Sequence, residues 1–281
     1  MRLPKFRLFD YETPGPGIEK DAPEKKGLAL FWDIFSRRAW KMISLNAMYT
    51  LFSVPSFLVH WFMIYMTLTL ITSEQINADT TGSVVVQITY LTTSLAIILY
   101  ALFGGGAVTS GMTYVLRQYR KDTHSWLWTD FISTYKKHFV KSTVVFVIDS
   151  IMLFLCGINF YFYGMLAGES IVAYLLQGFM IVVFLIFLLL HSYIYTLLVS
   201  YEKMSIRDIY KNSFILAIGK LPLTLSAVAL SSLICTLVAY LCFGLIYAII
   251  IVGVILFAFV AFINMFITYP TVEKYLGKSN S

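Results

Sequence analysis

The placement of the basic residues is the strongest constraint on how this chain can fold. All 21 Lys and Arg residues fall within four blocks, at residues 2–41, 117–141, 203–220 and 274–278. The stretches between the blocks are long and apolar, and the polar breaks inside them, at residues 73–83 and 159–170, carry acids but no cation. Multi-pass membrane proteins keep their basic loops on the inner side of the membrane. The charge pattern therefore predicts both the class of protein and its topology.

The composition excludes an ordinary soluble domain. Apolar residues make up 59% of the 281 residues and charged residues only 13%, against about 25% charged residues in a typical soluble domain. Such a chain has too little polar surface to cover a soluble core of its size. We expect the net charge of +6 to face anionic membrane lipids rather than nucleic acid, because the excess lies on one side of the membrane.

Six segments are predicted to cross the membrane, since a spanning helix needs about 20 apolar residues. Residues 221–269 would form a single helix of about 74 Å, so we expect them to fold back near Gly244 and cross twice. The first segment contains Pro55, which should kink it. The chain is thus predicted to be an all-α polytopic bundle of six transmembrane helices with both termini inside. Its spans are residues 42–71, 84–108, 144–163, 171–199, 221–241 and 245–269.

Three amphipathic segments accompany the spans on the basic side, at residues 27–41, 126–139 and 205–219. Apolar side chains recur in each at helical spacing, which predicts helices lying in the inner membrane interface. Docking of a cytoplasmic partner is a second use that is compatible with this placement. The predicted organisation is a cytoplasmic N-terminal arm over residues 1–41, a six-helix membrane domain over 42–270 and a cytoplasmic tail over 271–281.

Three polar side chains are expected at membrane depth. Asp149 lies eight residues beyond Lys141, which places it about 12 Å from the inner side of the membrane. The same arithmetic places His191 and Asn264 at roughly 16 and 14 Å. Ionisable groups inside a membrane are costly and mark functional sites, so these three residues form a hypothetical polar or proton-sensitive site. The alternative, which we favour, is that they satisfy one another and fix the register of the helices.

A run of small residues ends the second predicted span. It contains Gly104, Gly105 and Gly106, and Gly111 follows one turn later. Small residues let helix backbones approach closely in a membrane, whereas successive glycines also weaken a helix. Close packing is the favoured interpretation, and a hinge near the inner face is the alternative.

The sequence lacks the motifs of common enzymes. It contains no phosphate-binding loop, no metalloprotease helix and no serine nucleophile elbow. The three Cys residues lie in apolar stretches without metal-ligand spacing. An enzyme that uses Asp149 and His191 as acid and base would need a further polar catalytic group, and none is found. We therefore expect a protein that is not an enzyme and that holds neither a metal nor another cofactor.

Short motifs along the chain resemble those of YesL-like proteins, a bacterial family of membrane proteins of unknown function. The N-terminal run FDYETPGPGIEKDAPEKK (residues 9–26) resembles the opening of that family. Further matching motifs keep the order of the family: RAWK (38–41) with Asn46, SVP (53–55), GMTYVLR (111–117), WTDF (128–131), YK (135–136), IYKNS (209–213), TYP (268–270) and EKY (273–275). The resemblance covers nearly the whole chain and implies no catalytic residue.

The resemblance implies a protein of the bacterial plasma membrane that is associated with an ABC-type carbohydrate uptake system. The first function hypothesis is therefore an accessory subunit that contacts the permease or ATPase subunits of the importer. The second is a small transporter or channel in its own right, with a polar site around Asp149. The residues expected to dock a partner on the cytoplasmic face are Arg117, Trp128, Asp130, Phe131, Tyr135, Lys136 and Lys211.

Overall fold

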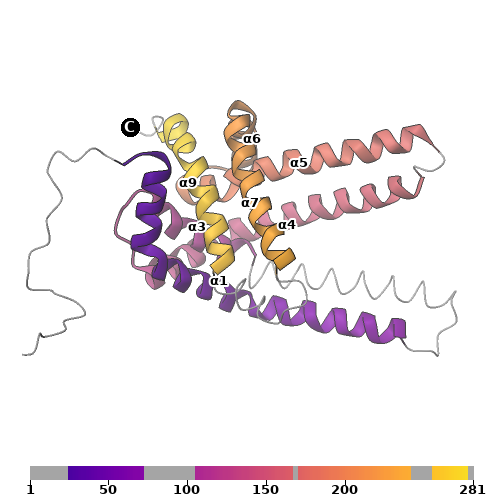
Figure 1. The fold of residues 1–281 in the computed structure, drawn as a ribbon, viewed down its shortest axis with the longest axis horizontal. Helices are drawn as coiled ribbons and strands as arrows, with labels where there is room; N and C mark the ends of the chain where they lie inside the picture. The colour runs from indigo at the N-terminus through magenta and orange to yellow at the C-terminus, as the bar shows by residue number, and fades with distance from the viewer. Residues whose placement is uncertain (1–24, 73–104, 167–169, 242–254, 278–281) are drawn as a thin grey trace, which may run out of the picture.

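The computed structural model describes residues 25–72, 105–166, 170–241 and 255–277. These residues form helices and contain no strand. The helices in Figure 1 are α1 (Gly27–Thr72), α3 (Gly106–Arg120), α4 (Leu127–Leu166), α5 (Ile171–Ser200), α6 (Ile206–Gly219), α7 (Leu221–Leu241) and α9 (Phe257–Leu276). The predicted second span reaches the described residues only at its end, and the predicted turn near Gly244 lies outside them. The all-helical class agrees with the sequence prediction.

Three of the described helices are long and apolar enough to cross a membrane. Their apolar stretches are Leu127–Gly164, Ile171–Ser200 and Leu221–Val238, in α4, α5 and α7. In the most apolar window of each stretch only 11% of the residues are buried, so most of these side chains face outward. An outward-facing apolar surface of this kind suits a helix surrounded by lipid. Figure 1 shows that α4 and α5 project as a hairpin, whereas α7 and α9 run across its direction.

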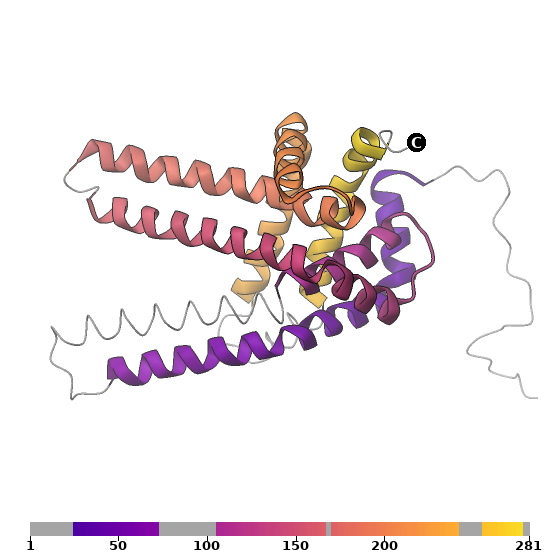
Figure 2. The same cartoon turned by 180° about the vertical axis from the view of Figure 1, so that it is seen from behind.

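Two of the amphipathic segments are continuous with the spans that follow them. α1 runs from Gly27 through Pro55 to Thr72, and α4 joins residues 127–139 to the predicted third span. The boundaries that we predicted at residues 41 and 139 are absent because no Gly or Pro ends the helix there. Figure 2 shows that α1 bends along its length, so its first part still takes a different direction from its last part.

The third amphipathic segment is a separate helix, α6. Its first turn is capped by Ser205, whose Oγ accepts a hydrogen bond from the Asp208 backbone N–H at 3.2 Å. This cap satisfies one of the donors that every helix leaves unpaired at its start. α6 ends at Gly219, and α7 begins two residues later at Leu221, with Pro222 in its first turn. Pro is tolerated there because the first turn needs no backbone donor.

α9 extends beyond the predicted end of the last span. It continues through Pro270 to Leu276, so the predicted tail over residues 271–281 begins as helix. Pro270 has no N–H and leaves the Phe266 carbonyl without its helical partner. Arg120 supplies a replacement, because its Nε donates to the Phe266 carbonyl at 3.4 Å and its guanidinium lies 4.5 Å from the Phe266 ring centre.

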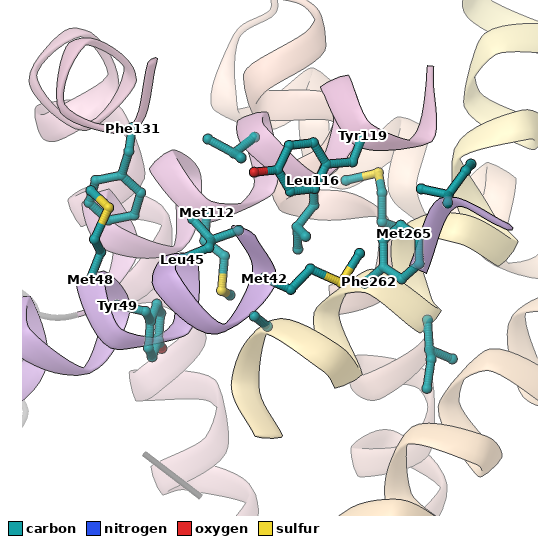
Figure 3. Packing of buried hydrophobic residues seen from close by; sticks show 14 of the residues in the cluster. Met42, Leu45, Met48, Tyr49, Met112, Leu116, Tyr119, Phe131, Phe262 and Met265 are labelled. Carbon is teal, nitrogen blue, oxygen red and sulfur yellow. The ribbon is translucent and has the colours of Figure 1, made fainter. Parts of the chain in front are cut away.

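The short helix α3 lies at the centre of the fold and packs against α1, α4, α5 and α9. Ten of its 15 residues are buried. Its apolar side chains Met112, Leu116 and Tyr119 belong to a core cluster with side chains of α1, α4 and α9, shown in Figure 3. Asn46 of α1 also reaches α9, where its Oδ1 accepts a hydrogen bond from the Ala258 backbone N–H at 2.7 Å.

Two glycines allow α3 to approach α4 closely. A Cβ atom on Gly106 would lie 1.9 Å from the Ser142 carbonyl oxygen, and one on Gly111 would lie 3.0 Å from the Phe131 carbonyl oxygen. The first distance is impossible for real atoms, so only glycine fits at position 106. Gly105 precedes the helix, and Gly104 lies outside the described residues. The contact at Gly106 and Gly111 is the kind of backbone packing that small residues permit in membrane helices.

A carboxylate ties the start of α1 to the loop between α3 and α4. Arg37 Nη2 donates to Asp122 Oδ2 at 3.1 Å, and Arg38 Nη2 donates to both Asp122 Oδ1 and the Thr123 carbonyl at 3.1 Å. Asp122 has a φ of 54°, a conformation that Asp and Asn adopt more readily than most residues. Burial raises the pKa of Asp122, but the hydrogen bonds from the two arginines outweigh burial, so the pKa lies below its ordinary 3.8.

Gly106→Ala should destabilise the protein severely, because the added methyl group collides with the α4 backbone. The cost of overpacking is about 1–3 kcal/mol or more, which thermal unfolding of the purified protein in detergent would measure. Gly157→Ala and Gly178→Ala are matched controls, since nothing lies within 4 Å of either added Cβ. These controls should be neutral or slightly stabilising. A Gly106→Ala protein as stable as the controls would contradict the close contact.

Asp122→Asn should lower the free energy of unfolding by about 1 kcal/mol at about pH 7, because solvent screens a pair this exposed. The lowered pKa means that the contribution of Asp122 is present above pH 3.8 and is lost as the pH falls below it. Thermal unfolding of both proteins should therefore differ at about pH 7, and the difference should shrink as the pH falls below 3.8. Asn can adopt the backbone conformation of Asp122. The loss of stability caused by Asp122→Asn should be smaller in a protein that also carries Arg37→Gln and Arg38→Gln, because the contact is then already lost.

Candidate functional site

Asp149 lies buried on α4 and contacts side chains of two other helices. Its Oδ1 accepts a hydrogen bond from Tyr210 Oη of α6 at 2.7 Å. Its Oδ2 lies 3.3 Å from His191 Nδ1 of α5, within ion-pair distance but without hydrogen-bond geometry. Asp149 is 4% exposed, whereas the His191 side chain is 45% exposed. The carboxylate therefore joins α4, α5 and α6, and His191 is its link to the surroundings.

Tyr210 is the donor to this carboxylate. Burial raises the pKa of the Tyr210 hydroxyl, and the hydrogen bond to Asp149 raises it further. The phenol therefore keeps its proton and donates it in the hydrogen bond to Asp149. The Tyr210 hydroxyl also lies 3.3 Å from the Val145 carbonyl of α4. An ionisable side chain at membrane depth requires such partners, because an isolated charge would be costly there.

Asn264 lies on the opposite wall of a cavity from this pair. The cavity measures about 270 Å³ and lies between α3, α5, α7 and α9. His191 and Asn264 both line it, and Asp149 reaches it through His191. The three side chains that the sequence placed at similar depth thus form one contacting pair and one residue across a cavity. The Asn264 Oδ1 is buried and has no hydrogen-bond partner among the described residues.

The cavity carries polar groups on all four of its helices. The side chains spaced one helical turn apart are Thr109 and Thr113 on α3, and Ser192 and Thr196 on α5. α7 contributes Ser231, and its Oγ, like the amide oxygen of Asn264, is buried without a partner in the described part of the chain. The remaining walls are apolar, and their side chains include Leu116, Leu256, Phe257, Val260 and Met265.

Sequence reasoning missed Tyr210 and the hydroxyl residues of the cavity. The sequence analysis treated residues 205–219 as an amphipathic helix without singling out Tyr210. In the structure the buried side of this helix consists of Ile209, Ser213, Leu216 and Ala217, whereas Phe214 and Ile218 are exposed. The pairs Thr109 with Thr113 and Ser192 with Thr196 are separated by four residues within apolar stretches. This spacing puts each pair on one helix face, which is the signal that a search for polar stripes would have used.

The seven residues predicted to dock a partner have different environments. Phe131 is fully buried in the core, and Arg117 Nη1 donates to the Val199 carbonyl at the end of α5, at 2.9 Å. Asp130 accepts hydrogen bonds at the start of α4, and Tyr135 packs between Phe52 and Phe139. These four residues serve internal contacts. The three that remain exposed are Trp128, Lys136 and Lys211.

The arrangement offers hydrogen-bonding groups that can hold a small molecule. No three His, Cys, Asp or Glu side chains come together in the described residues to form a metal site. The groups present are the carboxylate of Asp149, the imidazole of His191, the phenols of Tyr195 and Tyr210, the carboxamide of Asn264 and several hydroxyls.

Comparison with known proteins finds one family model that matches part of the chain. A family model described as "Protein of unknown function, DUF624" matches residues 42–160. The match contains α3, its glycine contact with α4, and Asp149, but it ends before His191, Tyr210 and Asn264. No curated protein and no solved structure matches the chain. The likeness to YesL-like proteins therefore stays a prediction from the motifs.

Tyr210→Phe should destabilise the protein by about 1–2 kcal/mol, because Asp149 loses its one hydrogen-bond donor and remains buried. Thermal unfolding in detergent is the measurement. Tyr174→Phe is a matched control, since Tyr174 is an exposed tyrosine on α5. If Asp149→Asn is combined with Tyr210→Phe, the two costs should not add, because both changes act on the same contact. Additive costs would show that the two side chains do not depend on each other.

Proposed function

We propose that this chain is a non-catalytic accessory subunit of an ABC-type carbohydrate uptake system in the bacterial plasma membrane. Two observations support the proposal. The first is the likeness of its motifs to those of YesL-like proteins. The second is a polar and aromatic surface at one end of the molecule that the described residues leave open. That surface is the observation on which the proposal chiefly rests.

The proposed topology has six transmembrane helices and both termini in the cytoplasm. It is supported by the confinement of all cations to four blocks. In this arrangement α7 contains the fifth transmembrane segment and α9 contains part of the sixth. Both helices run across the direction of the α4–α5 hairpin in Figure 1. Reporter fusions at the two termini should then lie on the same side of the membrane, and opposite sides would contradict the topology.

The open surface consists of exposed tryptophans near the starts of α1 and α4. Trp32, Trp40, Trp126 and Trp128, which we call the tryptophan surface, are each more than half exposed. The contact of Arg38 with Asp122 holds the two helix starts at the same end of the protein. Tryptophan is enriched both at membrane interfaces and at the energetic centres of protein interfaces. A partner subunit and lipid headgroups are both suitable neighbours, and we favour the partner because of the likeness of the motifs to those of YesL-like proteins.

A second candidate function is a small transporter or channel. The observation that favours it is the position of His191, which contacts the buried Asp149 and also lines the polar cavity. A group so placed can pass a proton between a buried carboxylate and a solute. The cavity, however, lies between four helices, and the described residues include no second buried acid that would extend a polar path beyond it.

Purification of the tagged protein from native membranes in mild detergent should recover permease or ATPase subunits of an importer. Replacing Trp128 by Ala together with Lys136 by Glu should reduce that recovery by about tenfold, as expected for the loss of an anchor residue in an interface. Phe160→Ala is the control, because Phe160 is also exposed on α4 but lies toward the tip of the hairpin.

Failure of the unaltered protein to recover any transporter subunit would contradict the accessory role. Equal recovery by the double variant and the control would contradict the role of the tryptophan surface. Solute flux in liposomes that contain this protein alone, abolished by Asp149→Asn, would favour the second candidate instead.

A further inference from the structure

The cavity between α3, α5, α7 and α9 carries an inference that does not depend on the proposed accessory role. We propose that it binds a neutral alcohol with a hydrocarbon body. Such a ligand has two sources, a membrane lipid with a hydroxyl headgroup or a small free alcohol. Cavities between the helices of a bundle are common places for ligand sites. At about 30 Å³ for each molecule of liquid water, this one has room for a small organic molecule.

Two buried atoms of the cavity have unused hydrogen-bonding capacity. The amide oxygen of Asn264 on α9 and the Oγ of Ser231 on α7 are buried and accept no hydrogen bond within the described residues. Buried polar atoms are almost always paired in folded proteins, because an unpaired one loses its bonds to water without a replacement. Both residues line the cavity, so a molecule inside it can supply the missing partner.

The hydroxyl groups of the cavity also favour a ligand that donates. Thr113 Oγ1 donates to the Thr109 carbonyl at 2.7 Å, and Ser192 Oγ donates to the Leu188 carbonyl at 3.4 Å. Each hydroxyl has one proton, which is already used, but both oxygens retain lone pairs. The cavity therefore offers several acceptors, and the unpaired Ser231 hydroxyl can also donate. An alcohol hydroxyl both donates and accepts, so it matches these groups.

The charge of the walls favours a neutral ligand. Among the described residues that line the cavity there is no carboxylate, Lys or Arg, and His191 is the one side chain that can become a cation. An ammonium group would meet no carboxylate on these walls. An anion would meet no Lys or Arg there, and the Asn264 amide oxygen cannot donate to it. Burying either charge without a partner is unfavourable.

The remaining wall accounts for the hydrocarbon body. Leu116 of α3 and Leu256, Phe257, Val260, Ala261 and Met265 near the start of α9 form an apolar lining. Apolar surface favours contact with hydrocarbon over contact with water. A polyhydroxylated molecule such as a free sugar would leave hydroxyl groups against this lining. A single hydroxyl at one end of an alkyl chain satisfies both parts of the cavity.

Two natural cysteines allow a direct test. Cys235 lines this cavity, whereas Cys156 lines a second cavity of about 320 Å³ between α4 and α5 whose other walls are apolar. Two variants are made, one that keeps only Cys235 and one that keeps only Cys156. In each variant the two remaining Cys residues of the chain are changed to Ser. The measurement is the rate at which methyl methanethiosulfonate modifies each thiol in lipid nanodiscs. The probes are 1-octanol, n-octane, which lacks the hydroxyl, and monooleoylglycerol as the lipid form of the alcohol.

We expect 1-octanol or monooleoylglycerol to slow modification of Cys235 several-fold, and n-octane to have little effect. At Cys156 the rate of modification should be the same with all three probes. Asn264→Leu should raise the alcohol concentration needed for protection by about tenfold, the usual effect of losing one hydrogen bond. Ser231→Ala should act in the same direction and provides the test if Asn264→Leu does not fold.

The pattern of protection identifies the source of the ligand or rejects the site. Protection by monooleoylglycerol at a low mole fraction indicates a lipid, and protection by 1-octanol alone indicates a small free alcohol. Equal protection by octane and octanol, or protection that both variants leave unchanged, would overturn the proposal, because the hydroxyl groups of the cavity would then have no role. A cavity that holds water alone would show no protection by any probe.

Discussion

The contact between α3 and α4 is the constraint on which the rest of the described structure depends. Gly106 lies so close to the Ser142 carbonyl that the two backbones touch where side chains would normally separate them. In lipid the hydrophobic effect does not drive helices together, so close backbone packing of this kind supplies much of the attraction. Since α3 also packs against α1, α5 and α9, its position on α4 sets where the other helices lie.

The described residues differ from those of a soluble protein in the large apolar surface that they leave outside the core. Most residues of the apolar stretches in α4, α5 and α7 face outward. The buried polar groups include Asp149, which Tyr210 contacts, and polar groups of the central cavity. Lipid makes this distribution stable, because polar groups can find hydrogen-bond partners only inside the bundle. The interior polar groups are therefore where function is to be sought.

The sequence predicted the helices better than their contacts. The predicted segments 171–199 and 221–241 coincide with the helices α5 and α7, because a long apolar segment between polar breaks favours one continuous helix. The sequence analysis also predicted a helix boundary ahead of residue 42 and another near residue 139. Both helices continue through these positions, because neither position has a residue that ends a helix. Phe131 was expected on the surface and is buried, since one sequence does not reveal how a helix is rotated about its axis. The hydrogen bond between Tyr210 and Asp149 was not predicted, for the same reason.

The bond from Arg120 to the carbonyl opposite Pro270 has a mechanical consequence. The Phe266 carbonyl is the one that Pro270 leaves without a helical donor. Its bond with Arg120 therefore fixes both the position of α9 along α3 and the rotation of α9 about its own axis. A sliding or twisting movement of α9 would break the bond and leave both groups unpaired in a largely apolar setting. This bond holds α3 and α9 together, and these two helices form two walls of the central cavity. A movement that admits or releases an occupant must then come from the other two walls, α5 and α7.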